Sequence, residues 1–173
     1  MDRAAPEERI YVAMGSNLGD RDAHLAAALA ALRATRGIEV LAVSPIYETD
    51  PVGPPPQGAY LNAVVELASA LGPHALMRRL LEIEAAAGRV RGAERNAPRS
   101  LDLDLLLYGD RELVDPDLEI PHPRLAERAF VLEPLCDLAA ERVHPVLGEK
   151  IEALARKRRD PAAVRRRRDS RPG

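Results

Sequence analysis

The sequence is poor in residues that several common kinds of site require. One of its 173 residues is a cysteine, Cys136, which excludes an internal disulfide and a cysteine-based zinc cluster. Lysine occurs only at Lys150 and Lys157, and no Gly-x-x-x-x-Gly-Lys-Ser/Thr motif is present, so a Walker-type phosphate loop is excluded. Any phosphate bound by the main body must therefore be held by arginine, by backbone N–H groups or by a metal ion.

Long apolar runs are also missing. No run approaches the roughly 20 residues that span a bilayer, and the first eight residues lack the apolar region of a secretory signal. The composition, with 46% hydrophobic and 30% charged residues, is typical of a globular chain. These features predict a soluble, cytoplasmic protein.

The formal net charge of -2 conceals a strong asymmetry along the chain. Residues 156–173 hold nine Arg or Lys against two Asp, whereas the remainder holds 16 basic against 25 acidic residues. We expect residues 1–159 to form a single domain and residues 160–173 to form a basic, disordered tail. Clusters of arginine can bind nucleic acid, but no aromatic residues interleave them and the body is acidic, so specific nucleic-acid binding is not expected.

The most informative segment ends in a strand pattern in which two aspartates alternate with leucines. Side chains two apart on a strand share a face, so Asp102 and Asp104 lie together while Leu101, Leu103 and Leu105 face the other way. Two neighbouring carboxylates are costly unless cations neutralise them. In proteins Mg²⁺ is usually held by one or two carboxylates plus substrate phosphates.

An arginine-rich loop precedes this strand. Arg89, Arg91, Arg95 and Arg99 offer forked donors that suit phosphate oxygens. A pair of carboxylates beside such a loop is the equipment that phosphoryl-type transfer needs, since that reaction depends on charge neutralisation and alignment.

Hydrophobic periodicity and turn residues predict an α+β fold. Strands are expected at residues 10–14, 38–47, 60–68 and 101–108, and helices at residues 20–36 and 73–87. Residues 49–58 must be a loop because they contain three consecutive prolines. This order is the ferredoxin-like split βαβ arrangement. A C-terminal hairpin near residues 109–114, a helix at 128–140 broken at Pro134, and a short helix at 151–159 follow.

The residues resemble the 6-hydroxymethyl-7,8-dihydropterin pyrophosphokinase family over residues 10–147. The segment that fits its signature best is Arg95-Asn-Ala-Pro-Arg99-Ser-Leu-Asp102-Leu-Asp104-Leu-Leu. Supporting matches in the same order are Gly15-Ser-Asn17, Tyr47-Glu-Thr-Asp-Pro-Val-Gly53, Tyr60-Leu-Asn62, Gly88-Arg-Val-Arg91 and Pro121-His122. Asp50, Asn96 and Pro123 depart from the pattern of some members.

The resemblance implies an enzyme that transfers pyrophosphate from ATP to the hydroxymethyl group of a reduced pterin, releasing AMP, in folate biosynthesis. It implies that Asp102 and Asp104 hold two Mg²⁺ ions and that Arg89 and Arg99 are catalytic. The residues that it places around ATP are Glu84, Arg91, Leu105, His122 and Arg128. Those that it places around the pterin are Thr49, Val52, Tyr60, Asn62 and Phe130. ATP and the pterin are then the partners, and a monomer is expected.

Blander interpretations of the same side chains stay open at this stage. The two aspartates could form the solvated face of an amphipathic strand, and the arginines could belong to a solvated loop. Tyr60 and Phe130 could be core residues, Glu84 could form a salt bridge, and His122 could serve as a cap.

Two other functions also stay open. One is a different two-metal nucleotidyl or phosphoryl transferase. Asn62 with Tyr60 and Phe130 argues against it, because these side chains suit a flat bicyclic ring. The other is an RNA-binding ferredoxin-like module, which would tolerate the loss of Asp102.

Overall fold

The computed structural model of the chain describes residues 8–51, 56–88, 100–168 and 171–173. Its first elements are β1 (Ile10–Ser16), α1 (Arg21–Ala34), β2 (Ile38–Val43), β3 (Tyr47–Thr49), β4 (Tyr60–Ser69), α2 (Pro73–Ala86) and β5 (Asp102–Tyr108). These are followed by β6 (Leu113–Asp115), β7 (Leu118–Ile120), a short 3-10 helix η1 (Leu125–Glu127), α3 (Ala129–Ala139), α4 (Ile151–Arg158) and β8 (Val164–Arg166).

Local signals account for the ends of the first two helices. The side chain of Asp20 accepts a hydrogen bond from the Ala23 N–H at 3.1 Å and so caps α1. After α1, Gly37 has a φ of +89°, a conformation that few other residues adopt without strain. Pro73 opens α2, where its missing N–H costs no helical hydrogen bond.

The main sheet is antiparallel, with strand order β5-β1-β4-β3-β8, and β2 also pairs with β4. The predicted ferredoxin-like core is therefore confirmed. The predicted strand over residues 38–47 is instead two strands, β2 and β3, which pair with successive parts of β4. Pro45 lies between them and cannot donate to a strand ladder, which explains the interruption.

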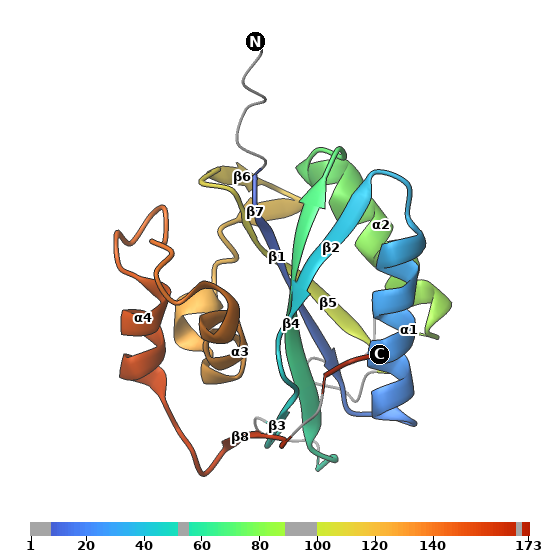
Figure 1. The fold of residues 1–173 in the computed structure, drawn as a ribbon, viewed down its shortest axis with the longest axis vertical. Helices are drawn as coiled ribbons and strands as arrows, with labels where there is room; N and C mark the ends of the chain where they lie inside the picture. Colours follow the sequence, from blue (N-terminus) through green and yellow to red (C-terminus); the bar gives the residue numbers. More distant parts are fainter. Residues whose placement is uncertain (1–7, 52–55, 89–99, 169–170) are drawn as a thin grey trace.

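Helices cover both faces of this sheet, with α1 and α2 on one side and α3 and α4 on the other (Figure 1). In β1, Ile10, Val12 and Met14 pack toward the first pair of helices, whereas Tyr11 packs toward the second. In β5 the leucines that alternate with the aspartates also lie in the first core. The alternation predicted for Asp102 and Asp104 is thus confirmed, and both carboxylates belong to the α3 side.

Two predictions for the C-terminal part differ from the structure. The helix expected to break at Pro134 is one continuous element, α3, in which Pro134 is buried beside Val131 and Leu135. Burial of that apolar face offsets the missing backbone hydrogen bond. The second difference is β8, which lies in the segment expected to be disordered and forms the strand next to β3 (Figure 1). The turn predicted at Gly109 is present, but the strand that follows it, β6, pairs with β7 in a separate two-stranded sheet and not with β5.

In the part of the chain that the structure describes, no helix combines the length and the apolar character needed to cross a membrane.

Candidate active site

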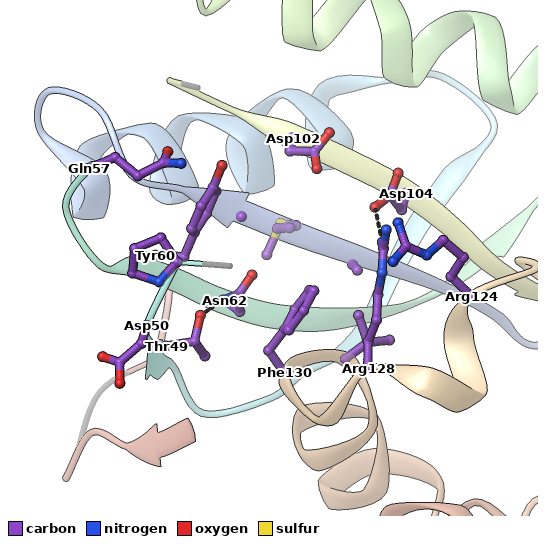
Figure 2. Close-up of a pocket in the computed structure, with 15 residues that line it drawn as sticks. Thr49, Asp50, Gln57, Tyr60, Asn62, Asp102, Asp104, Arg124, Arg128 and Phe130 are labelled. Carbon is purple, nitrogen blue, oxygen red and sulfur yellow. Dashed lines mark hydrogen bonds and ion pairs between the residues drawn. The ribbon is translucent and has the colours of Figure 1, made fainter. Parts of the chain in front are cut away.

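A pocket opens at the end of the sheet where β1 and β3 finish and where β4 and β5 begin (Figure 2). The residues that line it are Ala13, Met14, Gly15, Thr49, Asp50, Pro51, Gln57, Tyr60, Asn62, Asp102, Asp104, Arg124, Arg128, Phe130 and Val131. They come from four strands, from the loop between β3 and β4, from the residue before η1, and from the residues at and just after the start of α3. The pocket therefore exists only because the fold brings these chain segments together.

The register of the sheet places three of these residues in one row. Gly15 is paired with Asp102 on β5 and with Asn62 on β4. Paired residues of antiparallel strands point to the same face, so Asp102 and Asn62 flank a position that carries no side chain. Gly15 therefore forms an open floor of the pocket between the Asp102 carboxylate and the Asn62 amide.

Asp104 lies beside two basic side chains. Its Oδ2 is 3.9 Å from a terminal nitrogen of Arg128, and its Oδ1 is 4.0 Å from Nε2 of His122. Burial and the nearby Arg128 lower the pKa of His122 to about 4, so its ring is neutral at pH 7. The contact between His122 and Asp104 is then not an ion pair, whereas Arg128 is a cation that faces this carboxylate.

His122 is held in one orientation by the backbone. Its Nδ1 accepts a hydrogen bond from the Arg124 N–H at 3.1 Å. This bond assigns the ring proton to Nε2, the atom nearest Asp104. The Nε2–H of His122 thus lies on the side of Asp104 but, at 4.0 Å, outside hydrogen-bond distance, and His122 does not itself line the pocket.

The opposite side of the pocket is flat and partly aromatic. Tyr60 and Phe130 stand on either side of the hollow, with Asn62 between them (Figure 2). The Asn62 side-chain N–H donates to Thr49 Oγ1 at 2.7 Å, which fixes the amide and leaves its oxygen toward Gly15. Arg128 places its guanidinium carbon 5.6 Å from the centre of the Phe130 ring, a cation–π distance that helps to orient both side chains.

The structure gathers most of the predicted site residues that it describes. Those that line the pocket are Thr49, Tyr60, Asn62, Asp102, Asp104, Arg128 and Phe130. The predicted Val52, Arg89, Arg91 and Arg99 lie outside the described residues. None of the remaining three lines the pocket: Leu105 belongs to β5, and Glu84 and His122 lie beside that strand.

Glu84 has a clear structural role. It is buried on α2, and its Oε1 accepts a hydrogen bond from the Leu103 N–H at 3.3 Å. Leu103 is the residue between the two aspartates, so Glu84 fixes the edge of the strand that carries them. The side chain of Leu105 is buried in the core.

Other pocket residues were missed from the sequence. Asp50, Gln57 and Arg124 belong to loops, and Ala13 and Gly15 are small residues on β1. The sequence offers one indication for Gly15, because this residue belongs to the family match Gly15-Ser-Asn17. Its place opposite Asp102, however, depends on the register between β1 and β5. The Gln57 side chain receives a hydrogen bond from the Asn17 amide at 2.5 Å, which ties the loop before β4 to the turn after β1.

The donor set suits a hard divalent cation that also binds substrate. Asp102 and Asp104 share a face, and the Asp104 side chain is 29% exposed. Within residues 8–51, 56–88, 100–168 and 171–173, no group of three or more His, Cys, Asp or Glu side chains forms a complete protein cage. Mg²⁺ fits this arrangement, since it takes one or two carboxylates and completes its shell with water and phosphate oxygens.

An acidic pair joined through one pocket to a flat aromatic slot defines a phosphoryl-type transferase that handles a planar ring. Comparison with known proteins agrees with that class. The model of the 7,8-dihydro-6-hydroxymethylpterin-pyrophosphokinase (HPPK) family matches residues 11–140. The chain belongs to this family.

Named relatives are similar over most of their length. A Methylorubrum extorquens protein named 2-amino-4-hydroxy-6-hydroxymethyldihydropteridine pyrophosphokinase is 45% identical over 91% of this chain and 98% of its own. A Pseudomonas aeruginosa protein of the same name is 45% identical over 78% of this chain and 82% of its own.

Among solved structures, the Plasmodium falciparum HPPK-DHPS triple mutant matches with a TM-score of 0.68 at 12% identity. That match covers 90% of this chain, which spans 44% of the longer Plasmodium chain. At this identity the match supports the fold alone.

Proposed function

We propose that the protein transfers pyrophosphate from ATP to the hydroxymethyl group of 6-hydroxymethyl-7,8-dihydropterin. The products are AMP and the pterin pyrophosphate, an intermediate of folate biosynthesis. One observation carries the proposal: a single pocket joins the slot between Tyr60 and Phe130 to the acidic pair of β5. A planar ring and a phosphate chain can therefore meet in it.

The row across the sheet suits the shape of the acceptor. Strand β1 lies between the strands that carry Asp102 and Asn62, so the backbones of these two residues are about 10 Å apart, which is twice the spacing between neighbouring strands. A bicyclic ring hydrogen-bonded at Asn62 can extend over Gly15 and present a one-carbon arm toward Asp102. Thr49 and Val52 are proposed to add backbone contacts to the same ring.

The ring side chains orient the acceptor before reaction. Tyr60 and Phe130 supply two apolar faces, and stacking fixes the plane of the ring while leaving its in-plane position to hydrogen bonds. The Asn62 oxygen is available for a ring N–H, because its amide nitrogen is engaged by Thr49. Such orientation converts a collision of two substrates into a reaction within one complex.

The acidic pair organises the phosphate side. We propose that Asp102 and Asp104 hold two Mg²⁺ ions, which would neutralise phosphate charge when bound. Arg128 faces Asp104, and we propose that Arg128, Glu84, Leu105 and His122 lie around the nucleotide. Arg89, Arg91 and Arg99 are proposed to bind the triphosphate and stabilise the transition state.

The reaction itself is a displacement at the β-phosphorus. The hydroxymethyl oxygen forms a bond to that phosphorus and its proton is released to the solvent, while the bond to the oxygen shared with the α-phosphate breaks and AMP leaves with that oxygen. Little covalent chemistry is asked of the protein, which aligns the two substrates and neutralises developing charge. The neutral His122 can donate a hydrogen bond without adding a second positive charge beside Arg128.

The direct test is AMP release from Mg-ATP with and without 6-hydroxymethyl-7,8-dihydropterin. AMP is expected only when the pterin and Mg²⁺ are both present. Folded protein that binds ATP and releases no AMP on addition of the pterin would contradict the proposal. The expected monomer is a separate prediction, which light scattering at working concentration tests.

A further inference from the structure

The basic C-terminal segment is part of the sheet beside the pocket. β8 pairs with β3 in the register Tyr47 with Arg166, Glu48 with Arg165 and Thr49 with Val164. Two backbone hydrogen bonds close the ends of this pairing. The Asp50 N–H donates to the Ala163 carbonyl at 3.0 Å, and the Arg167 N–H donates to the Ile46 carbonyl at 2.8 Å.

The strand that pairs with β8 is β3, which is short and ends at the pocket. β3 has three residues, and β8 is its second neighbour in the sheet after β4. Thr49 ends β3, and Asp50 follows it directly; both line the pocket, where Thr49 Oγ1 fixes the amide of Asn62. A three-residue strand with one open edge is marginal, so its second neighbour matters for the position of Thr49.

Charged side chains add to the backbone pairing. Arg165 contacts both carboxylate oxygens of Asp50, at 3.0 and 3.5 Å. Beyond it, Arg166 and Arg167 approach Asp137 on α3 and Asp22 on α1, at 4.0 and 3.0 Å. Exposed pairs of this kind each contribute little, but these three connect successive residues to separate parts of the body and so select one register.

A second cavity shows how close β8 lies to the site. Its lining includes Thr49, Asp50, Arg128 and Phe130 together with Ala163 and Val164. The first four of these residues also line the active-site pocket. β8 therefore stands behind the wall that Thr49 and Asp50 contribute to the pterin slot.

We propose that β8 is a positioning element for pterin binding, in which Arg165 and the β3–β8 backbone pairing hold Thr49 and Asp50 in place. This inference rests on the proposed function of the pocket. Its consequence is selective: loosening β8 weakens binding of the pterin through Thr49 and Asn62. ATP binding on the β5 side is left nearly unchanged.

The test uses point variants of the full chain. Arg165→Pro removes a backbone donor and a charge at the centre of β8, Arg165→Glu places a like charge against Asp50, and Arg165→Lys keeps the charge. Arg168→Glu is the matched control, because it makes the same charge change at an exposed residue outside β8. For each protein we would measure pterin affinity by calorimetry, the KM for ATP, and the exchange rate of the Asp50 amide hydrogen.

The proposal expects Arg165→Pro to speed exchange of the Asp50 amide and to weaken pterin binding about tenfold, which corresponds to about 1.4 kcal/mol. Arg165→Glu should act in the same direction, Arg165→Lys should bind nearly as the wild type does, and Arg168→Glu should change neither quantity. Faster exchange with unchanged pterin affinity would overturn the proposal, and so would unchanged exchange. Release of AMP by the wild-type protein decides the proposed function separately, since it does not depend on these variants.

Discussion

Gly15 forms the floor of the pocket, and replacing it by alanine tests the arrangement of the site with one methyl group. A Cβ built at this position lies 3.0 Å from Asn62 Oδ1, 3.7 Å from a ring carbon of Tyr60 and 3.8 Å from the Leu61 carbonyl oxygen. The second and third distances are ordinary contacts, and Gly15 does not have a positive φ. The backbone thus accepts alanine, and the strain falls on the Asn62 amide.

The size of the effect follows from how firmly Asn62 is held. Its amide must retreat by a few tenths of an ångström, yet its N–H group is bonded to Thr49 at 2.7 Å. Losing one hydrogen bond to the ring costs about 1 kcal/mol, and overpacking a well-filled site adds about 1–2 kcal/mol. Together these predict a kcat/KM for the pterin that is lower by roughly 30- to 150-fold.

The assay measures how AMP release depends on the concentrations of the pterin and of ATP, and thermal unfolding is measured on the same proteins. Gly58→Ala is the control, because the nearest atom to its added methyl is the Asn17 carbonyl oxygen at 3.9 Å. We expect Gly15→Ala to keep its KM for ATP within about twofold and its Tm within a few degrees of the wild-type value. An unchanged kcat/KM for the pterin in Gly15→Ala would refute the assignment of Gly15 as the floor of the pocket. An equal loss of kcat/KM for the pterin and for ATP would refute the prediction that the substitution affects the pterin selectively.

Three further predictions concern other parts of the molecule. Asp102→Asn and Asp104→Asn should each lower turnover by at least about 10³-fold, equivalent to about 4 kcal/mol, with unchanged far-UV circular dichroism; near-normal turnover at saturating Mg²⁺ in either variant would refute the metal assignment. Phe130→Ala should weaken pterin binding by about 1–2 kcal/mol through lost stacking, whereas Phe130→Tyr should not; calorimetry that finds equal affinities would remove Phe130 from the slot. Burial lowers the pKa of His144, and its Nδ1 accepts two backbone N–H groups, so the free energy of unfolding should fall as pH drops below the unfolded-state value of about 6.5. Urea titrations of His144→Asn, which keeps an acceptor and cannot titrate, should show less of this fall, and an identical pH dependence would contradict the assignment.

Much of the core of the fold could be predicted from periodicity. The two-residue alternation of β5 predicted which face carries Asp102 and Asp104, and the structure confirms it because Leu103 and Leu105 are buried in the opposite core. The helix predicted over residues 20–36 is likewise present as α1, where Leu25, Leu29 and Leu32 recur at helical spacing and are buried. These predictions succeed because burial on one face of an element depends on local spacing alone.

The contacts between strands could not be predicted in the same way. Gly15 lies between Asp102 and Asn62 only because of the register of β1 with two neighbours. The register of β1 with β5 also shifts between Tyr11 and Val12, and no local sequence pattern predicts that irregularity. The role of Glu84 was missed for a similar reason, since its partner is a backbone N–H of a strand nineteen residues away.

The charge asymmetry of the chain acquires a different meaning in the structure. Composition alone predicted a disordered end, because nine basic residues lie in the last eighteen positions. In the structure, Arg165, Arg166 and Arg167 instead face carboxylates of the acidic body, which come from the loop after β3, from α3 and from α1. A basic segment and an acidic domain of one chain are complementary surfaces, and the open edge of β3 supplies the backbone pairing that isolated charges lack. Composition describes only the C-terminal segment itself, whereas the ordered structure of that segment depends on its pairing with β3, more than a hundred residues earlier in the chain.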